Sequence, residues 1–233
     1  MAEPDIEPNI SADWYRERAA RYAEVASRME QSVWTVRSHP KLTDEMAAFE
    51  RLKELVEPGA RGLDAGCGAG ARDVHLLGLA GFDMTGVDVV PENIEVSKQL
   101  HPELADRVSV ADLGEPLPFA DASFDFAMCE SVFQHMDDHA VFEVCLPELA
   151  RVVRPGGVIQ LLFKRGEGTV TILDPEYNAE RSFRLYDEAD VLAALGRHGV
   201  TLIEAETPDE LGGLLYVQDH REIPMCLMWC RKG

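Results

Sequence analysis

Apolar residues follow two patterns along this chain: short continuous runs, and longer segments in which they recur every three or four residues. The short runs predict seven strands, of which the first leads into Asp64 and the others lie at residues 83–89, 108–111, 124–129, 158–163, 200–205 and 225–231. The helical spacing predicts helices over residues 71–80, 91–100, 139–153 and 187–198. Strands that alternate with helices of these lengths indicate an α/β fold with a doubly wound, mostly parallel sheet.

A further helix is predicted near the start of the chain. It begins at Ser11, which can cap it, and its apolar positions step by four and three residues. These positions are Tyr15, Ala19, Tyr22, Ala26, Met29 and Val33. The apolar face either covers the core of the domain or forms a lid whose Tyr15 and Tyr22 touch a ligand.

The helix that follows begins near Thr43 and ends at Pro58, which is followed by glycine. We therefore expect two parts in the chain: an N-terminal helical extension or lid over residues 1–57, and the main α/β domain over residues 58–233.

The first predicted strand runs into a turn rich in glycine. Here Asp64 is followed by Gly66, Gly68 and Gly70, and a helix begins at once. Glycine lets a ligand approach the backbone without a Cβ in the way, and the start of a helix offers free N–H groups. A carboxylate beside the turn repels phosphate and suits a ligand that is cationic or bears hydroxyl groups. This combination favours S-adenosylmethionine, whose methionine part carries an ammonium group and whose sulfur is positively charged.

Three acids, Asp64, Asp88 and Asp112, stand at or just beyond the ends of successive predicted strands. In a doubly wound sheet, ligands bind outside the carboxyl ends of the strands, so the acids should border one cleft. Asp88 lies about 20 residues beyond the glycines, where it can accept both hydroxyls of a ribose. Asp112 can face the amine of an adenine, with Leu113 against the ring.

Five segments in the middle of the chain carry a resemblance to a known family. They are residues 63–70, 86–88, 111–113, 117–119 with 123–125, and 149–157. In this order they resemble the class I S-adenosylmethionine-dependent methyltransferases, specifically the small-molecule group similar to the ubiquinone and menaquinone biosynthesis enzymes. The resemblance covers about residues 60–165. It implies a seven-stranded sheet whose last strand is antiparallel and lies between the fifth and the sixth.

The resemblance also implies a site that binds S-adenosylmethionine and releases S-adenosylhomocysteine. The cofactor-binding residues expected from it are Asp64, Gly66, Cys67, Gly68, Gly70, Asp88, Val89, Asp112, Leu113 and Cys129, with Tyr15 and Tyr22 added from the lid. A methyl acceptor would then meet the cofactor beside the fourth strand.

The segment 129–137 lies beside the methyl group in this family. His135 can act there as the base for an oxygen acceptor, since histidine titrates near working pH. It can equally pack against the adenosine or cap the next helix. Glu130 either orients an amine acceptor or is a solvated loop acid, so oxygen and nitrogen acceptors both stay open.

Cationic residues follow the fifth predicted strand: Lys164, Arg165, Arg181 and Arg184. They either clamp a carboxylate of the acceptor or form ion pairs with surrounding acids on a solvated loop. The long connection over residues 207–224, with Tyr216 and His220, can shape the substrate pocket. Lys164, Arg165, Arg181, Tyr216 and His220 are therefore candidates for substrate binding.

Charge and composition narrow the class of partner. The net charge of −20 opposes binding to a phosphate backbone, so we expect a small-molecule acceptor and no nucleic acid. Five cysteines in apolar or glycine-rich surroundings indicate reduced thiols and a cytoplasmic protein.

We expect no membrane partner, because no apolar run approaches the roughly 20 residues of a membrane span. Neither histidines nor cysteines show the spacing of metal ligands, so no metal is expected. We expect a monomer or a homodimer.

Two other functions fit parts of the sequence. The spacing of Gly66, Gly68 and Ala71 also satisfies the relaxed nicotinamide fingerprint, with Asp88 at the matching distance. Against this, Asp64 crowds a pyrophosphate, Asp112 has no role, and the 163 residues after the turn leave little for a substrate domain. The second alternative is a methyltransferase-like fold that binds without catalysing, for instance as a partner subunit.

Overall fold

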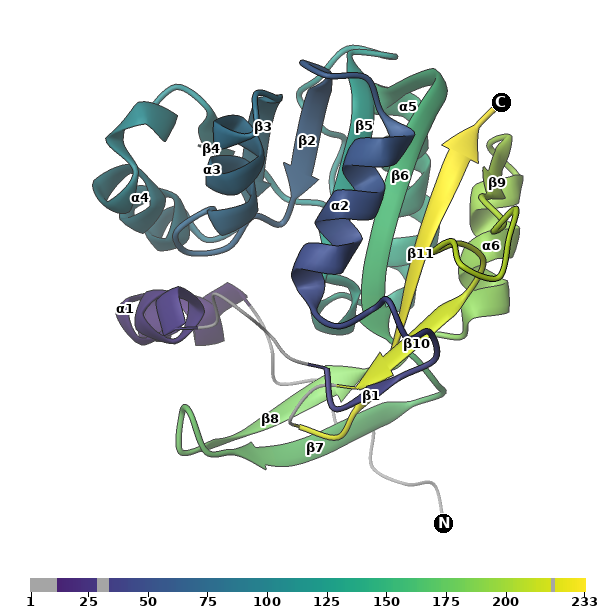
Figure 1. Cartoon of the computed structure of the whole chain (residues 1–233). Coiled ribbons are helices and arrows are strands. Elements are labelled where there is room, and N and C mark those ends of the chain that lie inside the picture. The colour runs from purple at the N-terminus through teal and green to yellow at the C-terminus, as the bar shows by residue number, and fades with distance from the viewer. Residues whose placement is uncertain (1–11, 29–33, 219–220) are drawn as a thin grey trace.

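The computed structural model describes residues 12–28, 34–218 and 221–233, and within them nine strands form the central sheet (Figure 1). Seven strands lie where the sequence predicts them: β2 (Arg61–Ala65), β3 (Asp83–Asp88), β4 (Val108–Val110), β5 (Phe124–Glu130), β6 (Val153–Lys164), β9 (Val200–Leu202) and β11 (Pro224–Lys232). From β4 the order runs β3, β2, β5, β6, and these strands are parallel. The last strand, β11, is antiparallel to β6 and to β9 and lies between them. The doubly wound α/β fold with an inserted antiparallel last strand is confirmed.

Two more strands extend the sheet beyond the predicted seven. β10 (Leu215–Gln218) pairs with the first half of β11, and β1 (Val36–Arg37) pairs with β10. A separate hairpin of β7 (Thr169–Asp174) and β8 (Ala179–Arg184) follows β6. The sequence predicts connections at these segments. In β7 the alternate residues Thr169, Thr171 and Leu173 are exposed, and β8 contains the polar residues Glu180, Arg181 and Ser182 in a row. Neither strand therefore has the continuous apolar run that predicts a buried strand.

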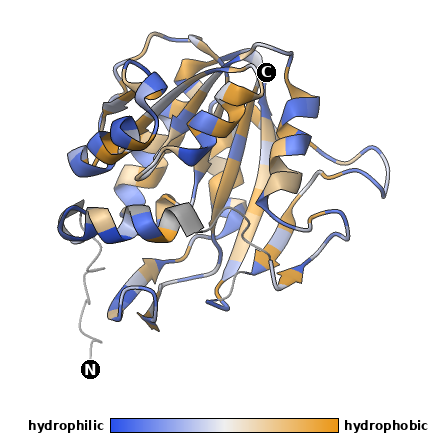
Figure 2. Cartoon of the chain, turned by 60° about the vertical axis from the view of Figure 1, so that its left-hand side comes forward, coloured by the Kyte–Doolittle hydropathy of each residue, from blue (hydrophilic) through white to orange (hydrophobic). Residues whose placement is uncertain are grey.

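Helices cover both faces of the sheet. One layer comprises α2 (Glu45–Leu55), α3 (Arg72–Leu79) and α4 (Pro91–Leu100), and the other comprises α5 (Leu146–Val152) and α6 (Glu188–Gly196). Figure 2 shows apolar residues concentrated on the strands and on the inward helix faces. The side chain of Asp44 caps α2 by accepting a hydrogen bond from the Ala47 backbone N–H at 3.1 Å. Because α2 packs into the same core as α3, it belongs to the body of the fold.

The helix predicted over residues 139–153 differs in its first half. There the chain forms a π-helical segment, η3 (Ala140–Cys145), before α5 begins. Pro147 lies in the first turn of α5 and has no N–H, so it cannot continue a regular helix from the preceding turn. Short 3₁₀ turns lie at Pro102–Leu104 (η1) and Phe133–His135 (η2).

The N-terminal helix α1 (Ala12–Arg28) lies at the edge where the parallel strands end (Figure 1). On one side it contacts α4, where Arg16 and Glu92 approach to 3.5 Å. On the other side it contacts the hairpin, where the Arg21 guanidinium donates to the Glu176 carbonyl at 2.8 Å. Residues 29–33, part of the predicted helix, lie outside the described residues. None of the helices described is both long and apolar enough to cross a membrane.

Candidate active site

A pocket of about 350 Å³ opens at the carboxyl ends of the parallel strands. Seven of the predicted cofactor residues line it: Tyr15, Tyr22, Gly66, Asp88, Val89, Asp112 and Leu113. Asn93, Ser131 and Val132 are among the lining residues that were not predicted individually. Asn93 lies on α4, a helix predicted without functional residues. Ser131 and Val132 fall inside the segment 129–137 that the resemblance places beside the methyl group.

The glycine turn is packed too closely for side chains at two positions. Gly66 has a φ of +100°, and a Cβ added to it would collide with Val132. Gly68 has a φ of +64°, and a Cβ there would lie 2.8 Å from the Tyr22 hydroxyl oxygen. Both positions therefore require glycine on two grounds, the backbone conformation and the neighbouring side chain.

Asp88 holds the turn in place and also faces the pocket. Its Oδ2 accepts from the Gly68 N–H at 2.9 Å, and its Oδ1 accepts from the Val90 N–H at 2.8 Å and the Asn93 side-chain amide at 3.0 Å. A carboxylate has about four acceptor sites, so capacity for a ligand hydroxyl remains. Burial raises the pKa of Asp88, and the three donors oppose that shift.

Four predicted cofactor residues are not among the residues that line the pocket: Asp64, Cys67, Gly70 and Cys129. Asp64 is 4% exposed, and burial, followed by the charges of Asp73 and Glu130, raises its pKa well above its usual range. The Gly70 N–H donates to the Ser97 hydroxyl at 2.9 Å. The contribution of these four residues to cofactor binding stays a prediction.

A second, smaller pocket of about 130 Å³ adjoins the first. The two pockets share four lining residues: Tyr15, Tyr22, Ser131 and His135. The smaller pocket is also bordered by the hairpin through Tyr177, Arg181 and Phe183. Because sequence analysis did not predict the hairpin strands, it missed the aromatic residues of this wall, although it did select Arg181.

His135 lies at the shared wall in a chain of hydrogen bonds. Arg181 donates from Nη1 to Asp174 at 2.7 Å and from Nη2 to the Tyr15 oxygen at 2.7 Å. The Tyr15 hydroxyl lies 2.8 Å from His135 Nε2, and since its oxygen already accepts from Arg181, its proton is directed to that nitrogen. Burial, followed by the positive charges of Arg181 and Lys164, lowers the pKa of His135 well below its usual value. The ring is thus neutral at physiological pH.

Glu130, at the end of β5, does not line either pocket. It accepts a hydrogen bond from the side-chain amide of Gln160 on β6. Burial, followed by the negative charges of Asp73 and Glu45, raises the pKa of Glu130 to about 8. This placement disfavours the alternative of a solvated loop acid, because Glu130 lies on a strand, is partly buried and is hydrogen-bonded.

The predicted substrate residues separate into two groups. Lys164 and Arg181 line the second pocket. Arg165 instead pairs with Glu188 at 2.8 Å and lies over the ring of Tyr216 at 4.3 Å, and Tyr216 donates to Glu188 at 3.1 Å.

Neither Arg165 nor Tyr216 lines either pocket. Tyr216 lies on β10, which runs along the edge of the sheet. For Arg165 the structure thus favours the alternative of an ion pair with a nearby acid. The same holds for Arg184, which pairs with Asp138 at 2.6 Å. His220 lies outside the described residues.

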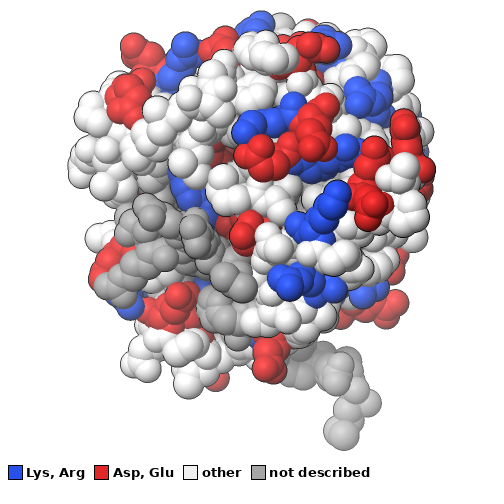
Figure 3. All heavy atoms as spheres, in the orientation of Figure 1, with Lys and Arg blue, Asp and Glu red and all other residues white. Residues whose placement is uncertain are grey.

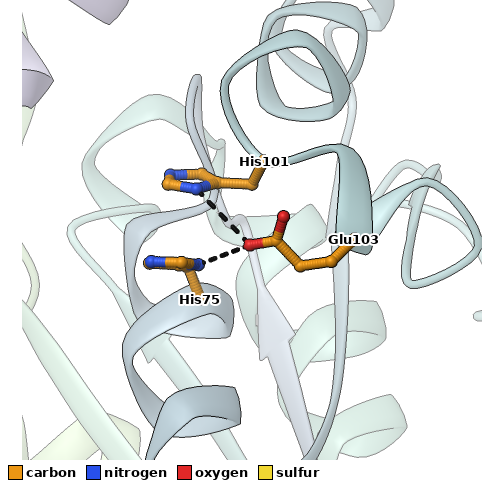
Figure 4. A group of neighbouring side chains, drawn as sticks. All are labelled: His75, His101 and Glu103. Atoms are coloured by element: carbon orange, nitrogen blue, oxygen red, sulfur yellow. Dashed lines mark hydrogen bonds and ion pairs between the residues drawn. The ribbon is translucent and has the colours of Figure 1, made fainter.

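One group of side chains was not expected from the spacing of histidines. His75 on α3 and His101 after α4 stack with ring centres 3.8 Å apart, and their Nδ1 atoms lie 2.8 Å and 3.7 Å from the same Glu103 oxygen (Figure 4). Nearly parallel rings do not direct their nitrogen lone pairs to one point, whereas a hydrogen bond to Glu103 accounts for the arrangement of His75. Independence from metals stays a prediction.

Comparisons with known proteins find methyltransferases. Residues 63–161 match the model of the methyltransferase domain family. The 2-methyl-6-phytyl-1,4-hydroquinone methyltransferase of Synechocystis is 35% identical over 106 residues, which are 46% of this chain and 32% of that protein. An O-methyltransferase of Aspergillus nomiae is 36% identical over 119 residues, which are 50% of each chain. The chain thus spans a third to a half of the length of these relatives.

A solved structure shows the same fold over nearly the whole chain. The 1,6-didemethyltoxoflavin-N1-methyltransferase of Burkholderia thailandensis, with its substrate and S-adenosylhomocysteine bound, has a TM-score of 0.63 at 19% identity and covers 100% of this chain and 93% of that one. Residues 63–161 are thus similar to the methyltransferase domain family, and the order of the strands shows that the chain has the fold of the class I S-adenosylmethionine-dependent methyltransferases.

Proposed function

We propose that this chain transfers a methyl group from S-adenosylmethionine to an oxygen or nitrogen atom of a small molecule. The observation that carries the proposal is the pair of adjoining pockets with a common wall of Tyr15, Tyr22, Ser131 and His135. A methyl donor in the larger pocket and an acceptor in the smaller one would meet at this wall.

The residues of the larger pocket fit the cofactor. Asp88 retains acceptor capacity, and Asn93 Oδ1 is buried with no hydrogen-bond partner in the part of the chain that the structure describes. Both can accept ribose hydroxyls. Asp112 at the pocket edge can accept from an adenine amine, and buried Leu113 offers an apolar surface to the ring. S-adenosylmethionine, when bound, supplies a methyl group activated by a positively charged sulfur.

Methyl transfer requires alignment and exclusion of water more than it requires reactive side chains. Tyr15 and Tyr22 on α1 line both pockets, so they can align the reactants and exclude water. The acceptor atom gives up a proton as it takes the methyl group. The Tyr15 hydroxyl can take that proton while it passes its own proton to Nε2 of neutral His135, which already accepts the Tyr15 hydrogen bond. This is the role we propose for His135 with an oxygen acceptor.

A small-molecule acceptor also suits the charge of the protein. The net charge is −20, and acidic and basic side chains are mixed on the face seen in Figure 3 without a broad basic area. Nucleic acid would therefore be repelled. All five cysteines are free thiols, in keeping with the expected cytoplasmic location.

The test is a transfer assay with S-adenosylmethionine labelled in its methyl group, offered with a panel of small hydroxyl and amine compounds. The proposal predicts label in a small-molecule product, at a rate that Asp88→Ala lowers when the cofactor is below saturation. Cofactor binding without transfer to any compound would favour the non-catalytic alternative. Label that appears in RNA at physiological salt would contradict a small-molecule acceptor.

A further inference from the structure

Arg181 connects the hairpin to the shared wall of the two pockets. Its side chain is 6% exposed, and its Nη2 donates to the Tyr15 oxygen at 2.7 Å. Aromatic rings hold it in place, since the guanidinium carbon lies 4.9 Å from the ring centres of Trp14 and Tyr177. On the premise that the chain transfers a methyl group to an oxygen acceptor, Arg181 bears on the proton step through Tyr15.

Asp174 fixes the other end of the Arg181 guanidinium. The Asp174 side chain is fully buried, and its Oδ2 accepts from Arg181 Nη1 at 2.7 Å and from Arg221 Nε at 3.0 Å. Its Oδ1 accepts from the Glu176 N–H at 3.0 Å. A guanidinium is planar and rigid, so an anchor at Nη1 also sets the direction in which Nη2 points to the Tyr15 oxygen.

His135 lacks the partner that commonly selects the tautomer of a histidine base. Such a ring usually donates from one nitrogen to a carboxylate or a carbonyl oxygen, which leaves the other nitrogen unprotonated. Nδ1 of His135 is buried and has no hydrogen-bond partner in the described part of the chain. Selection of the tautomer therefore depends on Nε2, whose partner is the Tyr15 hydroxyl at 2.8 Å.

Two arrangements of protons are possible between Tyr15 and His135. If Tyr15 donates to Nε2, the ring proton lies on Nδ1, and this N–H is the one group left unpaired at the contact among the described residues. If Nε2 donates to Tyr15 instead, both the Tyr15 hydroxyl proton and the unprotonated Nδ1 are unpaired, because the described partners of this hydroxyl are Arg181 and His135. Each buried unpaired group costs free energy, so the first arrangement is favoured.

This preference depends on Arg181. While Nη2 donates to the Tyr15 oxygen, the hydroxyl proton is directed away from the hairpin and toward His135. Without Arg181, the hydroxyl proton could turn into the space that the guanidinium leaves, and Tyr15 could then accept from a proton on Nε2. The second arrangement would lose its disadvantage.

The charge of Arg181 also acts on both members of the contact. Burial raises the pKa of Tyr15, and the charge and hydrogen bond of Arg181 oppose that shift. Negative charge that gathers on the Tyr15 oxygen during a proton transfer is therefore stabilised. After burial, the charge of Arg181 contributes to the low pKa of His135, which keeps the ring neutral before the reaction.

We propose that Arg181, anchored by Asp174, is a positioning residue that keeps Tyr15 donating to His135 Nε2 and so keeps this nitrogen ready to take up a proton. In the reaction, the acceptor O–H bond breaks as the oxygen bonds to the methyl carbon, and the proton passes to the Tyr15 oxygen. The Tyr15 O–H bond breaks in turn, and its proton forms the N–H bond at Nε2. His135 ends as an imidazolium, which carries the positive charge that the donor sulfur loses.

The experiment determines the tautomer of His135 by NMR on protein whose histidines are labelled with ¹⁵N. Spectra are recorded without ligand at about pH 8, above the usual histidine pKa of about 6.5, so that the ring is neutral. The spectrum of His135→Asn identifies the signals. In the wild-type protein we expect the Nδ1–H tautomer to exceed the Nε2–H tautomer by about tenfold or more, because the latter leaves a further buried group unpaired.

Arg181→Met removes the donor to Tyr15 and keeps a long apolar side chain among the rings. It should lower the tautomer ratio by about fivefold or more, as should Tyr15→Phe, which removes the hydroxyl. Arg21→Met is the matched control, because Arg21 also joins α1 to the hairpin, through the Glu176 carbonyl. It should keep the wild-type ratio, which separates positioning of the hydroxyl from docking of α1. If Arg181→Met does not fold, Arg181→Gln, too short to reach both partners, replaces it.

Three results would overturn the proposal: a wild-type ring protonated on Nε2, a ratio that the Arg181 variant leaves unchanged, or an equal change in Arg21→Met. Turnover is a second readout, since the Arg181 variant should lower kcat on an oxygen acceptor by about tenfold or more. A wild-type kcat would likewise contradict the proposal. The tautomer is measured without cofactor, so failure of the wild-type protein to bind S-adenosylhomocysteine would contradict the proposed function alone, and the two failures are distinguished.

Discussion

Asp88 combines two tasks at the glycine turn. Its carboxylate fixes the turn through Gly68 and the start of α4 through Val90 and Asn93, and it borders the pocket at the same time. A substitution there should therefore affect both the shape of the site and its affinity for a ligand.

We expect Asp88→Ala to weaken S-adenosylhomocysteine binding by about 1 to 3 kcal/mol, the cost of leaving buried hydrogen-bonding groups unpaired. The control is Asp83→Ala, at the opposite end of the same strand, where the carboxylate is exposed and pairs with Arg107. Calorimetry on both variants measures the difference. Equal affinities for the two variants would show that Asp88 does not face the cofactor.

His135 makes a prediction about the pH profile. Its pKa is well below the usual value, so the ring stays neutral as the pH falls through about 6.5, where an ordinary histidine takes up a proton. Turnover of the wild-type protein on an oxygen acceptor should therefore show no loss near pH 6.5. A loss near this pH that disappears from the residual activity of His135→Ala would mean that the ring titrates like an ordinary histidine.

The variant His135→Ala also distinguishes two roles for this residue, that of a base and that of a packing residue. His135→Ala should lower turnover by about 10²-fold to 10⁴-fold if the ring receives the proton, with cofactor affinity and melting temperature near wild type. Turnover within a few-fold of wild type would mean that the acceptor needs no base or that another group serves.

At the scale of elements, α1 and the glycine turn depend on each other. The Tyr22 hydroxyl on α1 occupies the space that a Cβ at Gly68 would need, at 2.8 Å. Gly68→Ala should displace α1 and weaken S-adenosylhomocysteine binding. Tyr22→Phe removes the obstructing oxygen, so the double variant should lose less affinity than the two single changes added together. A double-mutant cycle measured by calorimetry tests this coupling, and strict additivity would contradict the contact.

A buried polar network joins three adjacent strands of the sheet. Trp229 on β11 donates to Gln160 on β6, which donates to Glu130 on β5. The pKa of Glu130 is about 8 in the folded protein, against 4.5 for the free side chain, so the folded state holds a proton that the unfolded state has lost. The free energy of unfolding should therefore fall as pH rises from about 4.5 to 8.

Glu130→Gln removes this titration and keeps an oxygen that can accept from Gln160. We expect the variant to gain stability relative to wild type as the pH rises, by about 1 kcal/mol or more at pH 9, since each pKa unit corresponds to about 1.4 kcal/mol. Melting temperatures of both proteins from pH 5 to pH 9 give the comparison. A constant difference across this range would show that Glu130 does not titrate as described.

The main strands of the central sheet were predictable because each is a continuous run of apolar residues. The helices that cover the sheet were predictable because each buries one apolar face. The hairpin of β7 and β8, and the added strands β1 and β10, were not, since they are short or half exposed and their pairing depends on contacts distant in sequence. The larger pocket lies at the strand ends, and seven of the predicted cofactor residues line it. The smaller pocket is bordered in part by the hairpin, and of the hairpin residues that line it only Arg181 was selected in advance.

The position of a residue within a motif did not reveal whether it borders the cavity. Asp64 and Cys67 lie in the glycine turn beside Gly66, but only Gly66 lines the pocket. Tyr216 was chosen for the length of its connection, and a strand formed there and carried it to the sheet edge. Such distinctions depend on packing in three dimensions, which spacing alone does not encode.

For the whole molecule, one architecture produces two neighbouring spaces. The sheet edge and the glycine turn form the larger one, and α1 with the hairpin closes the smaller one against it (Figure 1).

The central claim is that the larger pocket binds S-adenosylmethionine. Isothermal titration of the purified protein with S-adenosylhomocysteine, and separately with NAD, tests it most directly. We expect saturable binding of one S-adenosylhomocysteine per chain and no comparable binding of NAD. Tight binding of NAD together with no binding of S-adenosylhomocysteine would contradict the claim.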